Sequence, residues 1–250
     1  MNTIQSPTGA TIASHHREGA TPGVIFCPGF RSDMNGTKAL SLDAWCKRHQ
    51  RQFTRFDYGG HGCSSGAFDD GSIGDWTTDA LAVLDQVCAG PQVIVGSSMG
   101  AWVMLLLALA RPERIHGLLG IAAAPDFTRH MLEQRLSNAQ REQLVTEGFC
   151  ETDNRYDDSP QRIQRHLLEE AEQHLLLRGP VAIHAPVRLI HGTADPDIPW
   201  QTSLRLMECL ASDDVELQLV KDGEHRLSGA ADLARMLETL ERLLAASRTG

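Results

Sequence analysis

The sequence predicts an α/β fold built on a doubly wound, mostly parallel sheet with a helical cap insertion. Short apolar runs alternate along the chain with longer segments whose apolar residues recur at helical spacing. Such alternation is typical of a parallel sheet that helices cover on both faces. One interval of about sixty residues, between two of the apolar runs, carries helical patterns only. In open sheets of this kind, ligands bind at the carboxyl ends of the strands.

The expected elements follow one another in a regular order. The strands span residues 24–27, 53–58, 93–95, 115–123, 187–190 and 215–220. The helices span residues 37–50, 75–88, 99–110, 199–210 and 233–244. The segment 99–110 is largely apolar, which is typical of a buried helix. Pro199 stands at the first turn of its helix, where proline is favoured.

The interval from about residue 125 to residue 185 has no strand pattern. It contains two polar-rich helical segments, at about 131–147 and 161–177. We interpret it as a cap over the carboxyl ends of the strands, and the alternative is an ordinary extension at the edge of the sheet. The expectation is therefore one domain, residues 1–250, made of a core (residues 1–125 and 186–250) and a cap (about residues 126–185).

Composition and charge exclude several classes of protein. A chain of 250 residues with 42% hydrophobic residues can bury a full core. Its net charge of −9, without a basic stripe, argues against a nucleic-acid partner. The longest apolar stretch, residues 101–110, is far shorter than the ~20 residues of a transmembrane segment. No leader pattern begins the sequence, and six widely spaced cysteines fit reduced thiols, so a cytoplasmic location is expected.

The motif Gly-x-Ser-x-Gly occurs twice, and its context separates the two copies. A nucleophile elbow needs a strand before the serine, a helix after it and small flanking residues that permit a strained turn. The second copy, residues 96–100, follows the apolar run 93–95 and leads into a buried helix. The first copy, around Ser64, lies in a Gly-rich stretch that is neither strand nor helix. Ser98 is therefore the candidate nucleophile.

A serine hydroxyl needs a base that accepts its proton and a carboxylate that orients the base. In this topology the expected chain order is serine, acid, histidine. Among eleven histidines, His225 follows the sixth expected strand in a loop that can carry its ring to Ser98. His191 and His61 are expected to be structural. No histidine has metal-ligand spacing with Cys, Asp or Glu, so neither a metal nor another cofactor is expected.

Three carboxylates compete for the role of the orienting acid. Asp195 follows the fifth expected strand and precedes a proline that rigidifies its loop, and it is favoured. Asp197, two residues later, and Asp126, after the fourth expected strand, remain alternatives.

An acyl-transfer site also needs N–H donors for the oxyanion of its tetrahedral intermediate. One donor is the backbone N–H of Met99, the residue after the nucleophile, at the start of a helix. The other is expected from the loop after the first strand, residues 28–32, and we assign it to the N–H of Phe30.

Over essentially the whole chain these residues resemble the α/β-hydrolase superfamily. The resemblance rests on the elbow at Ser98, on Gly-x-x-Asp-x-x-Ile-Pro around Asp195 and on Asp-Tyr-Gly-Gly-His-Gly-Cys-Ser from Asp57. Further segments are similar to the branch that holds the mitochondrial mycophenolic acid acyl-glucuronide esterase and palmitoyl-protein thioesterase. They are residues 28–30, 34–40, 56–58, 95–100, 110–113, 170–174 and 199–200. The resemblance implies a serine hydrolase whose triad is Ser98, Asp195 and His225.

The expected function is hydrolysis of carboxylic (acyl) esters through an acyl-enzyme on Ser98. Acyl-protein (palmitoyl) or acyl-CoA thioester hydrolysis is the alternative, and a non-catalytic binding protein of the same fold is a remote one. The expected partner is thus a small-molecule acyl ester or acyl thioester. Leu132, Leu136 and Phe149 are expected to line its acyl channel. Neither the acyl-chain length nor the oligomeric state follows from the sequence.

Overall fold

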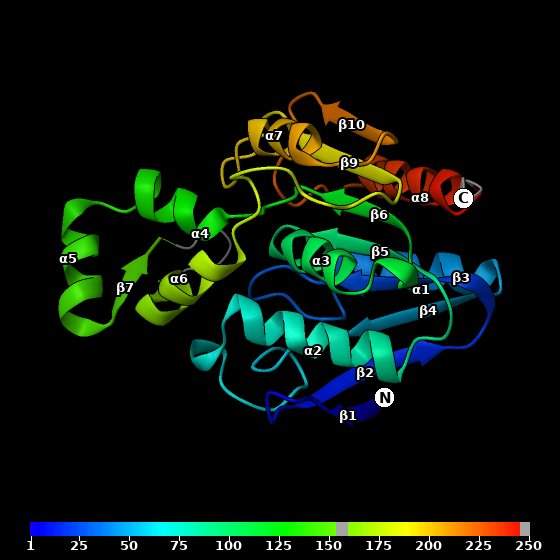
Figure 1. The fold of residues 1–250 in the computed structure, drawn as a ribbon, viewed down its shortest axis with the longest axis horizontal. Helices are drawn as coiled ribbons and strands as arrows, with labels where there is room; N and C mark the ends of the chain where they lie inside the picture. Colours follow the sequence, from blue (N-terminus) through cyan, green and yellow to red (C-terminus); the bar gives the residue numbers. More distant parts are fainter. Residues whose placement is uncertain (154–159, 246–250) are drawn as a thin grey trace.

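The computed structural model describes residues 1–153 and 160–245. An eight-stranded sheet forms its centre, with the order β1-β2-β4-β3-β5-β6-β9-β10 (Figure 1). The six strands that pair in parallel are β3 (Ala20–Cys27), β4 (Arg51–Phe56), β5 (Gln92–Ser97), β6 (Ile115–Ile121), β9 (Val187–Gly192) and β10 (Val215–Val220). The two that pair antiparallel are β1 (Asn2–Gln5) and β2 (Thr11–Arg17). The doubly wound, mostly parallel sheet expected from the sequence is confirmed.

The strands β1 and β2 at one edge of the sheet were not expected. The four residues of β1 are largely exposed, and β2 carries His15, His16 and Arg17 where a buried strand would carry apolar residues. Neither segment has the apolar run that marked the central strands, because an edge strand exposes more of its surface to water.

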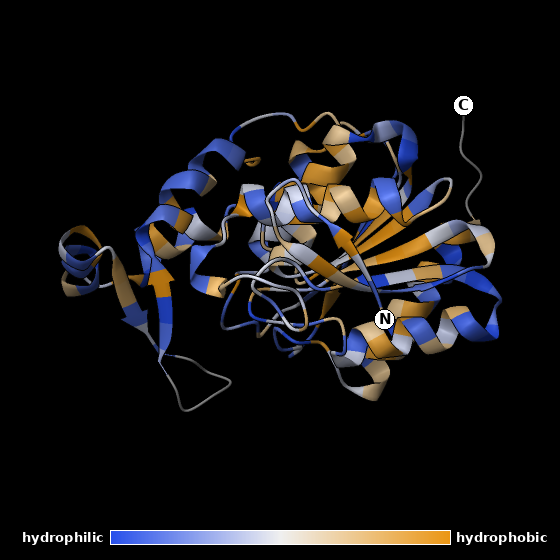
Figure 2. Cartoon of the chain, turned by 90° about the horizontal axis from the view of Figure 1, so that it is seen from below, coloured by the Kyte–Doolittle hydropathy of each residue, from blue (hydrophilic) through white to orange (hydrophobic). Residues whose placement is uncertain are grey.

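Helices cover both faces of the sheet. α1 (Thr37–Arg48) and α8 (Ala230–Ala245) pack on one face, whereas α2 (Ile73–Gln86), α3 (Met99–Ala110) and α7 (Gln201–Cys209) pack on the other. Successive residues of β3 point to opposite faces: Phe26 packs with residues of α1 and α8, and Ile25 packs with residues of α2, α3 and α7. Figure 2 shows hydrophobic strands between helices whose outer sides are hydrophilic.

The interval between β6 and β9 projects from the sheet at one end of the molecule (Figure 1). Its elements are α4 (Phe127–His130), a π-helical turn η3 (Met131–Arg135), α5 (Asn138–Glu147), β7 (Phe149–Thr152), β8 (Gln161–Gln164), α6 (Arg165–Ala171) and the 3₁₀ turn η4 (Glu172–His174). The expectation of helical patterns only was wrong here, because β7 and β8 form an antiparallel hairpin. Cys150 and Ile163 face each other in that hairpin and are buried with Leu136, Leu144 and Leu168.

Hydrogen bonds close this interval at its base and fasten it to the sheet layers. At the base, the Asp126 carboxylate accepts the backbone N–H groups of Leu176 and Leu177, at 2.8 and 2.9 Å, and so joins the two ends of the interval. The indole N–H of Trp102 in α3 donates to the carbonyl of His174, at 3.0 Å. The carboxylate of Glu170 accepts the N–H of Gly74 in the first turn of α2.

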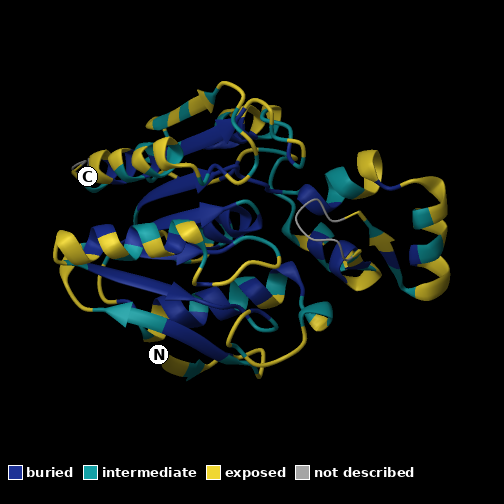
Figure 3. Ribbon diagram, turned by 180° about the vertical axis from the view of Figure 1, so that it is seen from behind, coloured by how far each residue is buried: buried dark blue, intermediate teal, exposed yellow. Residues whose placement is uncertain are grey.

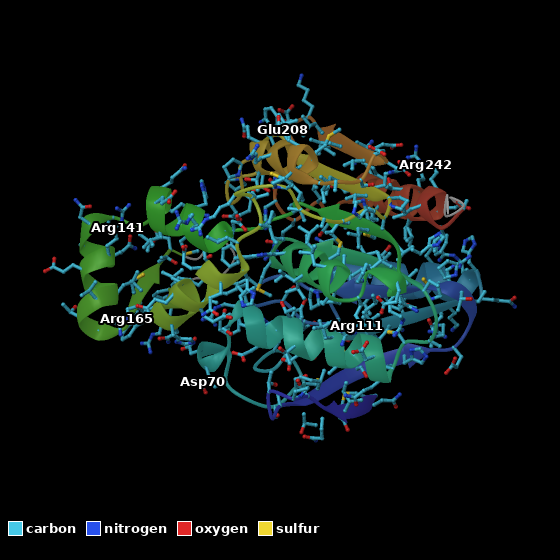
Figure 4. All side chains as sticks on the ribbon, viewed as in Figure 1. Asp70, Arg111, Arg141, Arg165, Glu208 and Arg242 are labelled. Carbon is cyan, nitrogen blue, oxygen red and sulfur yellow. The ribbon has the colours of Figure 1, made fainter. Side chains whose placement is uncertain are left out.

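The outer side of the interval is largely exposed, whereas the central strands are buried (Figure 3). Charged side chains such as Arg141 and Arg165 project from it into solvent, as Arg242 does from α8 (Figure 4). None of the helices in the described residues is both long and apolar enough to cross a lipid bilayer.

Candidate active site

Ser98 lies at the sharp turn that joins β5 to α3. Its φ of 55° is in the left-handed region, a strained conformation for a residue with a side chain. Two glycines make the turn possible. A Cβ atom on Gly96 would lie 2.5 Å from the Cα of Ala101, and one on Gly100 would lie 2.1 Å from the carbonyl oxygen of Cys27. The turn is therefore the nucleophile elbow that the second Gly-x-Ser-x-Gly motif predicts.

The structure brings Ser98, His225 and Asp195 into one chain of hydrogen bonds. The Oγ of Ser98 lies 2.9 Å from Nε2 of His225, and Nδ1 of His225 lies 2.7 Å from Oδ2 of Asp195. A carboxylate only accepts, so Nδ1 carries the proton and Nε2 is free to accept the serine proton. The side chain of His225 is 13% exposed and that of Asp195 is fully shielded.

Asp195 is held in its ionised form by several donors. The Oδ1 atom accepts the backbone N–H groups of Asp197 and Ile198, at 2.8 and 2.9 Å. Burial by itself would raise the pKa of this carboxyl, but hydrogen bonds from His191 and His225 and the charge of His225 hold the pKa well below its ordinary value. An ionised acid can orient the base and stabilise the imidazolium that forms during catalysis.

His191 takes a larger part in the site than expected. It is fully buried, and its Nε2 lies 3.1 Å from both Oδ2 of Asp195 and the carbonyl oxygen of Ile198. Because both neighbours are acceptors, Nε2 carries a proton and Nδ1 accepts from the hydroxyl of Ser203, at 2.7 Å. His191 is therefore a second donor to the acid. Its place directly after the apolar part of β9 was the only sign of this in the sequence.

Phe30 and Met99, whose backbone N–H groups are the expected oxyanion donors, line the same cavity as Ser98. Gly29 brings the loop of Phe30 so near that a Cβ on Gly29 would lie 3.4 Å from the Cβ of Ser98. Within the described residues, neither N–H donates to a protein oxygen. Both donors are free to receive a substrate oxygen, as an oxyanion hole requires.

A cavity of about 980 Å³ opens above Ser98. Its apolar lining residues include Phe30, Met99, Phe127, Met131, Leu136 and Ile198. Its polar lining residues include Arg31, Ser32, Asp33, Lys38, Arg226 and Ser228. Two arginines bridge its rim: Arg135 of η3 donates to the carbonyl of Asp197 at 3.0 Å, and Arg31 donates to the carbonyl of Arg162 at 3.2 Å.

Of the three residues expected to line an acyl channel, only Leu136 faces this cavity. Leu132 is 38% exposed, because the π-helical turn directs Met131 to the cavity and Leu132 to solvent. Phe149 lies in the hairpin, where the guanidinium of Arg162 covers its ring at 4.0 Å. The expectation was wrong for Leu132 and Phe149, since the hairpin and the π-turn were not visible in the sequence.

The alternative candidates have other partners in the structure. Asp126 binds the two backbone N–H groups described above and no histidine. Asp197 pairs with Arg135, with Oδ1 and Nη2 3.6 Å apart. Ser64 lies in a loop, and its hydroxyl donates to the carbonyl of Asp57 at 2.6 Å. His61 is buried against aromatic rings, and burial lowers its pKa to about 4.

One group of side chains in the described residues is close enough together to bind a metal ion, namely Asp195, Asp197 and His225. Both ring nitrogens of His225 already bond to Asp195 and Ser98. An ion at this place would displace one of those hydrogen bonds.

Comparison with known sequences identifies the relatives of this chain. A family model described as "Alpha/beta hydrolase family" matches residues 24–235. The palmitoyl-protein thioesterase ABHD10, mitochondrial, of Mus musculus is 40% identical over 234 residues, which cover 93% of this chain and 78% of that protein. The protein of the same name from Homo sapiens is 35% identical over 245 residues, which cover 98% and 80%. The resemblance to this branch is thereby confirmed.

Comparison with solved structures identifies similar relatives. The alpha/beta hydrolase domain-containing protein 10 from mouse superimposes with a TM-score of 0.89 at 38% identity, over 97% of both chains. A putative hydrolase from Agrobacterium vitis S4 gives a TM-score of 0.94 at 38% identity, over 97% of this chain and 98% of that one. With this fold, the matching family model and these relatives, the chain is a hydrolase that belongs to the alpha/beta hydrolase family.

Proposed function

We propose that this chain is a serine hydrolase that cleaves acyl esters or acyl thioesters through an acyl-enzyme on Ser98. The observation that carries the proposal is the unbroken hydrogen-bond chain from the serine hydroxyl through His225 to the shielded carboxylate of Asp195. A base that is held in this tautomer can remove the serine proton as the hydroxyl attacks.

In the acylation step, Oγ of Ser98 attacks the carbonyl carbon of the substrate and its proton passes to Nε2 of His225. The oxyanion that forms accepts hydrogen bonds from the N–H groups of Phe30 and Met99. When the intermediate collapses, the bond to the alcohol or thiol oxygen or sulfur breaks. His225 returns its proton to that leaving group.

In the deacylation step, water takes the place of the leaving group. His225 accepts a proton from the water as it attacks the acyl carbon. The bond from that carbon to Oγ of Ser98 then breaks, the carboxylic acid leaves, and His225 returns its proton to Oγ. Asp195 keeps the imidazole in one orientation through both steps and stabilises its positive charge.

The mixed lining of the cavity suits a substrate with an apolar acyl group and a polar leaving group. Phe127, Met131 and Leu136 would cover the acyl chain, and Arg31 and Lys38 would contact the leaving group. The mammalian relatives are named palmitoyl-protein thioesterases, which favours thioesters beside oxygen esters.

We also propose that about residues 126–185 act as a cap that selects the substrate, since Met131, Arg135 and Leu136 line the cavity. The relatives carry "mitochondrial" in their names. The cytoplasmic location expected for this chain therefore stays a prediction.

The direct test is Ser98→Ala, assayed with p-nitrophenyl butyrate and with a fluorophosphonate probe. Loss of both turnover and covalent labelling supports the proposal, and turnover that survives the substitution refutes it. A series of paired oxygen esters and thioesters of increasing chain length then separates the two substrate classes. A preference for chains of about ten carbons or more in the thioester series would identify a long-chain thioesterase.

A further inference from the structure

Lys38 lies beside the loop that carries His225 and is one of the polar residues that line the cavity. We infer that Lys38 is a positioning residue for the catalytic base, an inference that rests on the proposed hydrolase function. Its ammonium group donates to the carbonyl of Arg226, the residue after His225, and to the hydroxyl of Ser228 at 3.3 Å. The hydroxyl of Ser228 donates in turn to the carbonyl of Arg226 at 3.0 Å, so three groups close a small ring of hydrogen bonds.

The loop between β10 and α8 contains a strained residue that its surroundings must hold in place. Leu227 has a φ of 44°, in the left-handed region that a leucine adopts only where its surroundings enforce it. Glu224 and Arg226, the residues on either side of His225, are exposed. Leu227 itself is buried against the cluster that includes α1 and α8. The ammonium of Lys38 therefore bonds to the residues on either side of the strained Leu227.

Lys38 is well placed for this role because α1 is fixed to the sheet. Its neighbours Ala39 and Leu42 are fully buried, so the first turn of α1 is a rigid base for the amine. No carboxylate in the described residues forms an ion pair with Lys38, and its bonds go instead to the His225 loop. A charged donor forms hydrogen bonds roughly twice as strong as a neutral one.

The charges around Lys38 make this fastening sensitive to pH. Burial, with the nearby positive charge of Arg226, lowers the pKa of the amine to about 8, and Asp232 in α8 opposes the shift. Asp33 also lines the cavity. Above pH 8 the amine loses its charge, so its bond to the carbonyl of Arg226 weakens and the loop is held less firmly.

The competing explanation is that Lys38 contacts the substrate, because it lines the same cavity. The two roles differ in what they predict. A residue that positions His225 affects every substrate equally and acts on kcat, since the base serves acylation and deacylation alike. A residue that binds an anionic leaving group affects only anionic substrates and acts mainly on KM.

The test compares Lys38→Met, Lys38→Arg and the matched control Lys47→Met, which lies at the exposed end of the same helix. Each is assayed with a neutral and an anionic ester of one acyl group. Lys38→Met should lower kcat by about 10- to 100-fold for both esters, as expected for a displaced catalytic group. Lys38→Arg should recover most of that loss, and Lys47→Met should match the wild type. Wild-type kcat in Lys38→Met, or a loss confined to KM for the anionic ester, overturns the inference.

The pH profile is the second readout and does not depend on the stability of Lys38→Met. In the wild type, kcat should fall as the pH rises through about 8. Lys38→Arg keeps its charge, so this decline should move to higher pH, and an unmoved decline overturns the inference. Ser98→Ala reports separately on the proposed function, because turnover there refutes the hydrolase site whatever Lys38 does.

Discussion

Replacing Gly100 by alanine should separate the two halves of the proposed oxyanion hole. A Cβ at this position would lie 2.1 Å from the carbonyl oxygen of Cys27 and 2.4 Å from that of Pro28. Both atoms belong to backbone, so no side chain can rotate away. Real Cβ contacts stay beyond 3.0 Å. The strand end that leads to Phe30 must therefore move from the elbow by about 0.9 Å, the shortfall from that limit.

A displacement of this size has calculable consequences. Misplacement of reacting groups by about 1 Å can cost roughly 100-fold in rate, and loss of one oxyanion donor costs about 100- to 1,000-fold in kcat. We expect Gly100→Ala to lower kcat for p-nitrophenyl butyrate by at least about 100-fold. Overpacking of the same site should reduce the free energy of unfolding by about 1–3 kcal/mol in urea denaturation.

Gly179→Ala is the matched control, because nothing lies within 4 Å of its added Cβ and it should keep wild-type kcat and stability. Wild-type kcat in Gly100→Ala, with the same melting behaviour, would refute the reasoning. It would mean that the loop of Phe30 tolerates the shift and that its N–H does not need its present distance from Ser98.

Three further predictions concern buried polar groups. Asp195→Asn should lower kcat by about 10⁴-fold while the fold persists, measured beside circular dichroism, since the base loses its tautomer. His61→Phe should remove most of the pH dependence of the unfolding free energy between pH 6.5 and 4. In the wild type, the unfolded chain protonates His61 below pH 6.5, whereas the buried ring of the folded chain has a pKa of about 4. The wild type therefore loses up to ~1.4 kcal/mol of unfolding free energy per pH unit as the pH falls through this range. A urea series at each pH checks this, and equal slopes contradict it. Asp126→Asn should cost about 1–3 kcal/mol of unfolding free energy, because an amide cannot accept the N–H groups of both Leu176 and Leu177. Unchanged urea midpoints would show that these bonds contribute little.

Local pattern was sufficient for much of the architecture. The apolar runs that became β5 and β6 and the apolar helix α3 bury most of their side chains, and such burial requires a run of apolar residues that is visible in the sequence. The elbow was predictable for a related reason. A Cβ on Gly96 would overlap backbone atoms of Gly100 and Ala101, so this constraint is local to the turn, whereas the constraint on Gly100 comes from the distant backbone of Cys27 and Pro28.

The interval before β9 was harder to predict. β8 has only four residues, and Ile163 is its single buried side chain. So short a pattern is compatible with a helix, and only pairing with Cys150 across the hairpin makes it a strand. The same uncertainty misplaced Phe149, whose position depends on the hairpin and on the arginine stacked over it.

The sequence by itself determined the order of the six parallel strands and of the five helices that cover them, the strained serine turn and the candidate residues Ser98, Asp195 and His225. Only the tertiary structure decided that these three lie within 2.9 Å of their partners, that His191 also binds Asp195, and that Lys38 bonds to the loop of His225. The physical reason is the separation along the chain over which each kind of interaction acts. Periodicity and the steric constraint on Gly96 act within a few residues, whereas a hydrogen bond between residues 98 and 225 joins segments 127 positions apart and exists only once the sheet has formed.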